Sequence, residues 1–78
     1  METAEEIFGL NVRKARKSRN ISQEKLASLA EMDRAHMGEI ERGNVSPSLK
    51  TMNHIAQALD MPVSKLLDWS KPSLSTAY

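Results

Sequence analysis

The side chains with the clearest capacity to recognise a ligand lie in one short segment, MDRAHMGEIERG, residues 32–43. An arginine guanidinium only donates hydrogen bonds, and a glutamate carboxylate only accepts them. If the segment is a helix, each residue turns by about 100°, so Met37 and Ile40 share the inner side. The opposite side then carries Ala35, Gly38, Glu39 and Arg42, flanked by Arg34. Such a low, polar surface can approach the floor of a groove closely.

No arrangement of residues for catalysis or metal binding accompanies this segment. The two histidines, His36 and His54, lie apart in the sequence and lack a nearby nucleophile or a second ligand at suitable spacing. The chain contains no cysteine, which excludes disulfides and thiolate metal sites and fits a reducing, intracellular compartment. We therefore expect neither an enzyme nor a cofactor.

Five helical blocks must position these residues. Apolar residues recur at helical spacing, no window alternates as a strand does, and turn signals separate the blocks. This pattern predicts an all-α fold, a compact five-helix bundle, with helices at about residues 5–19, 22–30, 33–42, 48–59 and 63–69. The expected N-caps of the middle three helices are Ser22, Asp33 and Ser48. The expected core residues of the second and fourth helices are Leu26, Ala27, Leu29, Ala30, Leu49, Met52, Ile55, Ala56 and Leu59.

Length and charge limit the class of protein. A chain of 78 residues makes one small domain, near the lower size at which a core suffices, so a second copy would add useful burial. The formal net charge is only +1, so attraction to nucleic acid depends on how charge is distributed. No apolar run approaches membrane-spanning length, and we expect no signal peptide. We expect a domain over residues 1–71 and a flexible tail over 72–78.

The second and third blocks resemble a known DNA-binding arrangement. Only about three residues join them, which forces a sharp angle between two short helices, as in a helix-turn-helix. The segments SQEKLA, IERG, PSLKT and IAQAL follow at the spacing of the helix-turn-helix domain of Cro/C1-type phage repressors and bacterial xenobiotic-response-element (XRE) regulators. The resemblance covers about residues 8–67. The wording MDRAHMGEIERG, in so short a chain, is also similar to restriction–modification controller proteins.

This resemblance implies that the helix over residues 34–42 enters the major groove of double-stranded DNA. The family's base-reading positions match Arg34, Ala35 and Glu39, with His36 and Gly38 nearby. An arginine can bind guanine O6 and N7 with two hydrogen bonds, and an alanine can contact a thymine methyl. Arg34 and Ala35 are the corresponding candidates here.

Two of these positions have a second interpretation. Glu39 either accepts a hydrogen bond from cytosine N4, or it stays in solvent and pairs with Arg42 or Arg34. Gly38 costs about 1 kcal/mol relative to alanine inside a helix. It either lets the backbone approach DNA or marks a contact between helices.

Glu41 points toward the inner side of its helix, beside Met37 and Ile40. In the phage repressor branch the matching glutamate pairs with an arginine of the first helix, and the matching residue here is Arg16. The resemblance therefore implies a partly buried Arg16–Glu41 ion pair. The alternative is an exposed charge pattern of little energetic value.

Contacts to the DNA backbone are expected around the helix pair. The family counterpart of Gln23 binds a phosphate, and Ser22 can combine that role with capping. Glu31 lies in the turn where family members often have glycine, whose left-handed conformation other residues adopt at some cost. The further backbone candidates, each of which could equally be ordinary loop polarity, are Arg42, Asn44, Ser46, Ser48 and Lys50.

One reading helix covers too few base pairs for useful specificity, so two copies on half-sites about one helical turn apart are expected. The leading hypothesis is a homodimeric transcriptional regulator bound to a two-fold symmetric operator, on the nucleoid in a bacterial cytoplasm. The alternatives are a DNA-binding antitoxin and a protein-interaction module without DNA binding. No membrane and no small-molecule effector are expected as partners. The expected dimer interface is Met61, Val63, Leu66, Leu67 and Trp69.

Overall fold

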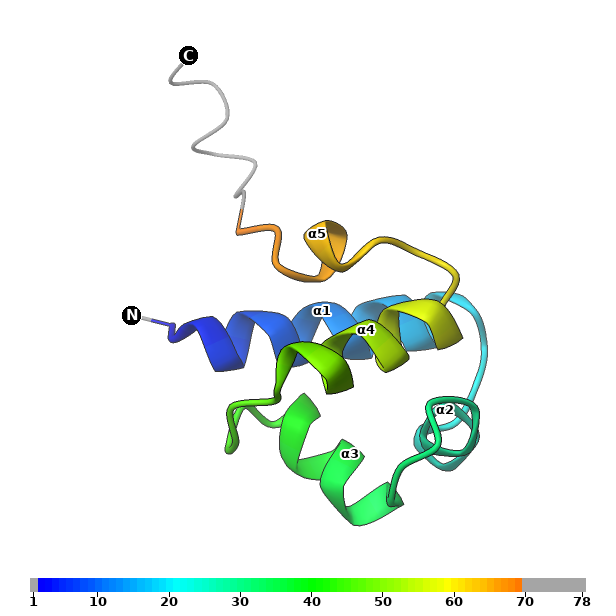
Figure 1. Ribbon diagram of the computed structural model, residues 1–78. Coiled ribbons are helices and arrows are strands. Elements are labelled where there is room, and N and C mark those ends of the chain that lie inside the picture. The colour runs from blue at the N-terminus through cyan, green and yellow to red at the C-terminus, as the bar shows by residue number, and fades with distance from the viewer. Residues whose placement is uncertain (1, 70–78) are drawn as a thin grey trace.

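The computed structural model describes residues 2–69 and contains the five expected helices in the expected order (Figure 1). The prediction of an all-α fold is confirmed, and the expected tail over residues 72–78 lies outside the described residues. Among residues 2–69, no helix is long and apolar enough to cross a membrane. The helices are α1 (Ala4–Ser18), α2 (Gln23–Leu29), α3 (Arg34–Glu41), α4 (Leu49–Ala58) and α5 (Val63–Leu66).

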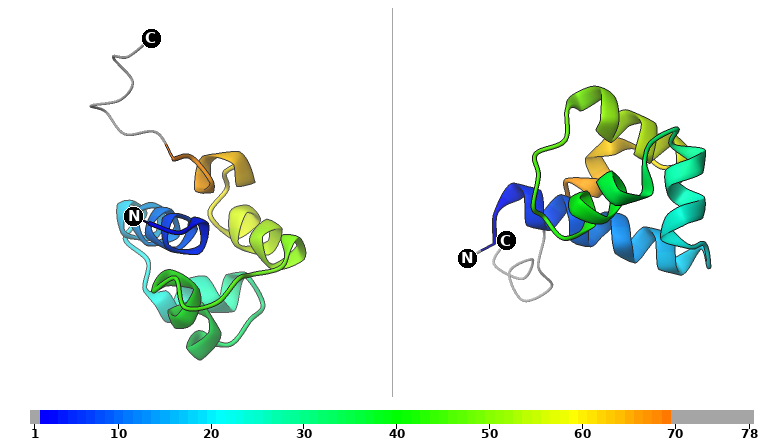
Figure 2. Two further views of the ribbon diagram at one scale, coloured as in Figure 1. Left: turned by 90° about the vertical axis from the view of Figure 1, so that its left-hand side faces the viewer. Right: turned by 90° about the horizontal axis from the view of Figure 1, so that it is seen from below.

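The helices enclose a single interior. α3 lies at one edge of the molecule and α5 at the opposite edge, with α1 and α4 between them (Figure 1, Figure 2). α1 contacts both α3 and α5, α2 contacts both α3 and α4, and α4 contacts α5. The short fifth helix ends at Leu66, so the expectation that it continues to Trp69 is wrong.

The core combines residues from all five helices. Its buried members are Phe8, Val12, Leu26, Ala27, Ala30, Met37, Ile40, Ile55, Ala56, Leu59 and Leu66. Two residues expected in this core, Leu29 and Leu49, are instead 49% and 77% exposed. Leu29 lies about 100° around the helix from the side that Leu26, Ala27 and Ala30 bury. Leu49 begins α4, where no neighbouring helix covers it.

Side-chain caps define where most of the helices begin. Ser22 accepts a hydrogen bond from the backbone N–H of Lys25 at 2.9 Å. Ser48 accepts one from Thr51 at 3.1 Å, so both expected caps are confirmed. Asp33 occupies the N-cap position of α3, but its side chain makes no capping bond. The helix begins where predicted, but the prediction that the Asp33 side chain caps it is wrong.

The turn between α2 and α3 keeps the conformation that glycine usually supplies. Glu31 has φ of 58°, and the N–H of Met32 bonds back to the carbonyl of Ala27 at 2.9 Å. This pattern closes the end of α2 as a Schellman motif. Glu31 therefore accepts the left-handed strain, and the sharp angle between α2 and α3 is preserved.

Glycine permits α1 to pass very close to α3. A side-chain carbon at Gly9 would overlap the carbonyl oxygen of Ile40 and would lie 2.7 Å from that of Glu41. α1 thus supports the C-terminal half of α3 through direct backbone contact. The sequence carries no signal of this contact beyond an isolated glycine in a helical block.

Asn11 connects α1 to the opposite edge of the molecule. Its Nδ2 donates to the backbone carbonyls of Leu66 at 2.9 Å and Asp68 at 3.0 Å. These are carbonyls at the end of α5, which a helix of four residues cannot satisfy internally. α1 therefore braces both α3 and α5.

Candidate nucleic-acid interface

The outer side of α3 is open at its N-terminal end. Arg34 and Ala35 are exposed, as expected, and His36 is exposed as well, while Met37 and Ile40 are fully buried beneath them. The five N–H donors of Arg34 have no partner within residues 2–69. This end of the helix therefore presents an unpaired guanidinium next to a small apolar side chain.

Gly38 does not lie bare on this outer side. It is buried, because the side chains of Arg42 and Gln23 lie over it. A side-chain carbon at Gly38 would lie 3.3 Å from Nη1 of Arg42 and 3.4 Å from Oε1 of Gln23. The expectation that Gly38 forms part of the exposed surface is wrong, since two long polar side chains cover it.

Glu39 is paired on both of its carboxylate oxygens. Its Oε1 lies 3.2 Å from Nη2 of Arg42, and its Oε2 accepts a hydrogen bond from Nδ2 of Asn44 at 2.9 Å. The hydrogen bond from Asn44, followed by that from Arg42, holds the pKa of Glu39 below its ordinary value. Glu39 therefore stays charged and neutralises Arg42 rather than Arg34.

A buried polar network locks α3 against α1 and α2. Nε and Nη2 of Arg16 donate to the two carboxylate oxygens of Glu41 at 2.7 and 3.0 Å. The side chains are only 12% and 4% exposed, respectively, so the predicted buried ion pair is confirmed. Nε2 of Gln23 donates to Glu41 at 3.1 Å. Glu41 thus connects three helices and does not face the outer side of α3.

The combination of a short interhelical turn, an exposed second helix and this internal lock is the geometry of a helix-turn-helix. The sequence profile of the helix-turn-helix family matches residues 12–66. The chain belongs to the helix-turn-helix family. Members of this family are DNA-binding transcriptional regulators, and the resemblance stated from the sequence is confirmed.

Several relatives are control proteins. The control protein C.SmaI of Serratia marcescens is 40% identical over 62 residues, which cover 80% of this chain and 74% of that protein. The control protein C.BamHI of Bacillus amyloliquefaciens is 40% identical over 65 residues, which cover 82% of this chain and 80% of that protein. The crystal structure of the restriction–modification controller protein C.AhdI from Aeromonas hydrophila matches with a TM-score of 0.78 at 37% identity, covering 80% of this chain and 94% of that one.

A polar hollow of about 280 Å³ lies where α1, the start of α2 and the end of α3 meet. It is lined by Arg13, Arg16, Gln23, Glu41 and Arg42. Arg16 and Glu41 cancel one another there and Arg42 is paired with Glu39, which leaves the positive charge of Arg13. Arg13 was not among the expected contact residues. Its i, i+3 spacing from Arg16 was the signal that could have placed it on this face.

The side chains expected to contact the DNA backbone differ in whether they already have partners within the protein. Ser22 and Ser48 serve as caps, and Asn44 is bonded to Glu39. Ser46 and Lys50 are exposed, and neither has a side-chain partner within residues 2–69. Among the expected backbone contacts, Ser46 and Lys50 therefore have the side chains with the fewest partners within residues 2–69.

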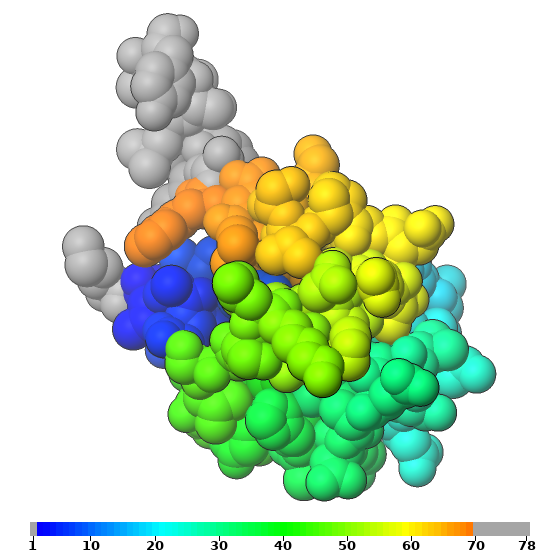
Figure 3. Space-filling model, viewed as in Figure 1, coloured from blue at the N-terminus to red at the C-terminus, as the bar shows by residue number. Residues whose placement is uncertain are grey.

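On the side of the molecule away from α3, the start of α1, the start of α4 and the chain after α5 approach one another (Figure 3). Leu67 and Trp69 are 45% and 54% exposed there, and Leu49 is also exposed. Leu67 also lines a small hollow of about 150 Å³, together with Phe8, Pro47 and Met52. We call Leu49, Leu67 and Trp69 the apolar rim.

The structure removes one residue from the expected dimer interface. Leu66 is fully buried and closes the monomer core, because the short α5 directs it between α1 and α4. Met61 and Val63 are partly buried and pack against the same core. Of the expected interface, Leu67 and Trp69 alone expose large apolar surface. Leu49 was not expected there, because its position in the apolar pattern of α4 predicted burial.

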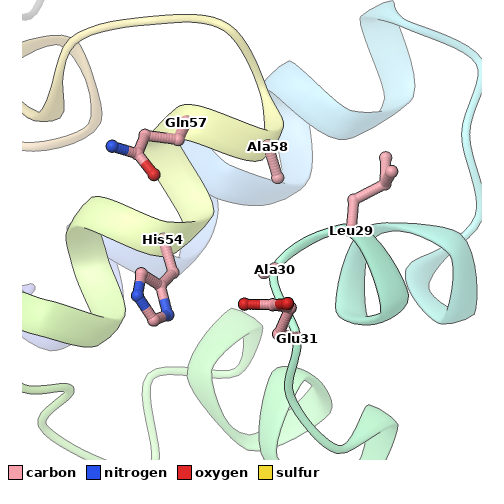
Figure 4. A pocket seen from close by; sticks show the side chains of 6 residues that line it. All are labelled: Leu29, Ala30, Glu31, His54, Gln57 and Ala58. Carbon is pink, nitrogen blue, oxygen red and sulfur yellow. The ribbon is translucent and has the colours of Figure 1, made fainter.

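A further hollow of about 370 Å³ lies between the end of α2 and the middle of α4. Figure 4 shows that His54 and Glu31 both border this space, while Leu29 stands at its rim. His54 is partly buried. This hollow lies on neither the reading side of α3 nor the apolar rim.

Proposed function

We propose that this protein is a sequence-specific transcriptional regulator that binds a two-fold symmetric operator as a homodimer, with α3 in the major groove. The observation that carries the proposal is the exposed N-terminal end of α3 on a helix held rigidly from behind. Arg34 and Ala35 are exposed, while the Arg16–Glu41 pair fixes the helix that presents them. A rigid helix can place side chains against base edges with the precision that direct readout requires.

In this proposal Arg34 binds a guanine through O6 and N7, and Ala35 contacts a neighbouring thymine methyl. His36 lies beside them at the edge of the contact. Gln23, Ser46 and Lys50 approach backbone phosphates on either side of the reading helix. Phosphate contacts set the register of the protein on DNA, whereas Arg34 supplies the sequence preference.

The apolar rim supports the homodimer. Leu49, Leu67 and Trp69 expose large apolar side chains on a domain too small to bury them itself. A two-fold symmetric contact brings the same patch of each copy together. Two copies then present two reading helices to successive major grooves.

The relatives support a narrower role. Two control proteins are 40% identical to most of this chain, and the C.AhdI structure is that of a restriction–modification controller. We infer that this protein likewise controls transcription within a restriction–modification system. Reporter expression from the promoters of such a system, with and without the protein, tests this role, and unchanged expression would contradict it.

The experiment that tests DNA recognition is selection of bound sequences from a random pool, followed by footprinting. A two-fold symmetric site should be enriched, and its affinity should fall steeply with salt. A pool without any symmetric enrichment and without salt-sensitive binding would overturn the proposal. It would favour a module that binds protein instead.

A further inference from the structure

The guanidinium of Arg42 lies over the middle of α3, although Arg42 itself follows the helix as its C-cap. A side-chain carbon at Gly38 would lie 3.3 and 3.5 Å from Nη1 and Nη2 of Arg42. Long side chains on helices lean toward the N-terminus, so the head group of Arg42 reaches one turn back along the outer side. Arg42 therefore presents its charge near the centre of the reading surface and not at its edge.

Two neighbours fix the position of this guanidinium. Oε1 of Glu39 holds Nη2 at 3.2 Å, and Asn44 holds the other oxygen of Glu39 at 2.9 Å. Oε1 of Gln23 also lies close to Gly38, with its amide nitrogen anchored to Glu41. The head group thus lies beside Glu39 and near Gln23, over a residue that has no side chain.

The arrangement leaves donors available to a ligand. Within residues 2–69, Nη1 of Arg42 has no hydrogen-bond partner, and Nη2 uses only its contact with Glu39. The Arg42 side chain is 60% exposed. A guanidinium held in plane by one carboxylate, with its other edge open, is prepared for two parallel hydrogen bonds to a pair of acceptors.

We propose that Arg42 is a second guanine-reading residue, that Glu39 orients it, and that Gly38 provides the space in which it lies. This inference rests on the proposed function and changes two roles within it. Arg42 reads a base instead of a phosphate, and Glu39 acts through Arg42 instead of accepting from cytosine. Glu39, on the DNA side of α3, then serves as a fixed counterion for Arg42.

The first test compares wild-type protein and Arg42→Ala on the selected operator and on operators changed symmetrically at each base pair, over a range of salt concentrations. Loss of a two-bond guanine contact should weaken operator binding about tenfold or more. It should also remove the preference at one symmetric G·C pair, other than the pair read by Arg34. Arg19→Ala is the matched control, since Arg19 is the C-cap of α1 and lies outside α3.

A different pattern would overturn the inference and leave the proposed function intact. If Arg42→Ala weakens all operators equally and makes the salt dependence shallower by about one phosphate, Arg42 contacts the backbone. If wild-type protein enriches no symmetric site, the proposed function itself fails. Circular dichroism and thermal unfolding of each variant establish that the fold is kept.

Glu39→Gln tests the orienting role in two backgrounds. In the wild-type protein it should reduce discrimination at the Arg42 base pair several-fold. In Arg42→Ala protein the same change should strengthen DNA binding, because Glu39 is then an uncompensated negative charge near phosphates. An equal loss in both backgrounds would mean that Glu39 reads a base itself.

Gly38→Ala tests the space. The added methyl would crowd Arg42 and Gln23 by a few tenths of an ångström while improving helix propensity. The variant should unfold at the same or a higher temperature, yet lose discrimination at the Arg42 base pair. Unchanged discrimination in a stably folded variant would contradict the role assigned to Gly38.

Discussion

The two sides of α1 stabilise their neighbours by different means. Toward α3, α1 makes backbone contact at Gly9 and a buried ion pair through Arg16. Toward α5, it contributes the side-chain amide of Asn11 and a contact with one short helix. On the α3 side, the helices pack closely around a buried ion pair. On the α5 side, Leu67 and Trp69 remain exposed. α3 is therefore fixed within the monomer, and in the proposed homodimer a second copy would cover the α5 side.

The largest expected effect is a loss of stability when Glu41, on the α3 side of α1, is replaced. Glu41→Ala leaves Arg16 buried without its partner, which costs about 3–5 kcal/mol of unfolding free energy. Urea denaturation measures the loss. Glu39→Ala, on the same helix but with an exposed side chain, should change the unfolding midpoint little. A similar small effect for both variants would show that the lock does not stabilise the fold.

Gly9→Ala should have the next largest effect. The new methyl would overlap the carbonyl oxygen of Ile40, so α1 and α3 must separate, at a cost of about 3 kcal/mol. Thermal unfolding detects it, and Gly38→Ala serves as the control because its nearest contacts are flexible side-chain ends. If Gly9→Ala unfolds at the wild-type temperature, the close approach of the two helices is not required.

Leu67→Asp tests whether the exposed apolar residues beside α5 form the dimer contact. A charge at a dimer contact should weaken association about a hundredfold, about 2.7 kcal/mol, while the monomer keeps its helical content. Light scattering during gel filtration reports the mass. Leu29→Asp is a matched control, because Leu29 is similarly exposed, 49% against 45% for Leu67, but lies outside the apolar rim. Dimers that persist in Leu67→Asp, or dissociate equally in both variants, would move the interface elsewhere.

The smallest expected effect on stability concerns the turn between α2 and α3. Glu31→Gly relieves a left-handed conformation with φ of 58° and should raise unfolding free energy by about 1 kcal/mol. Glu24→Gly, inside α2, should lower it by about the same amount. Denaturant unfolding of both variants measures the two signs. A destabilised Glu31→Gly protein would mean that the side chain of Glu31 contributes more than its conformation costs.

Much of the fold could be predicted because its signals are local. Ser22 and Ser48 mark helix starts through chemistry that acts within one turn, and helical periodicity identified the buried side of α3 through Met37 and Ile40. The Arg16–Glu41 pair followed from resemblance to a family rather than from spacing. These features depend on few neighbours, and the structure reproduces them.

The errors share a different origin. Periodicity gives the direction of a side chain around its own helix but not where the neighbouring helix ends, so Leu49 was placed in the core and Leu66 outside it. Leu29 was placed in the core although it lies about 100° around α2 from the buried side. Gly38 was assigned to the surface because a helical projection ignores the reach of a long side chain. Arg42 covers it from one turn away. Contacts such as Gly9 with Ile40 depend on two distant segments and leave no local pattern.

Base reading by the N-terminal end of α3 is tested by the affinity of wild-type and Arg34→Ala protein for the selected operator and for each symmetric single-base-pair variant of it. Arg34→Ala should lose its preference at one symmetric base pair, with the fold and the salt dependence preserved. Equal weakening on every sequence, with a shallower salt dependence, would make Arg34 a phosphate contact. That result would contradict base reading by the N-terminal end of α3.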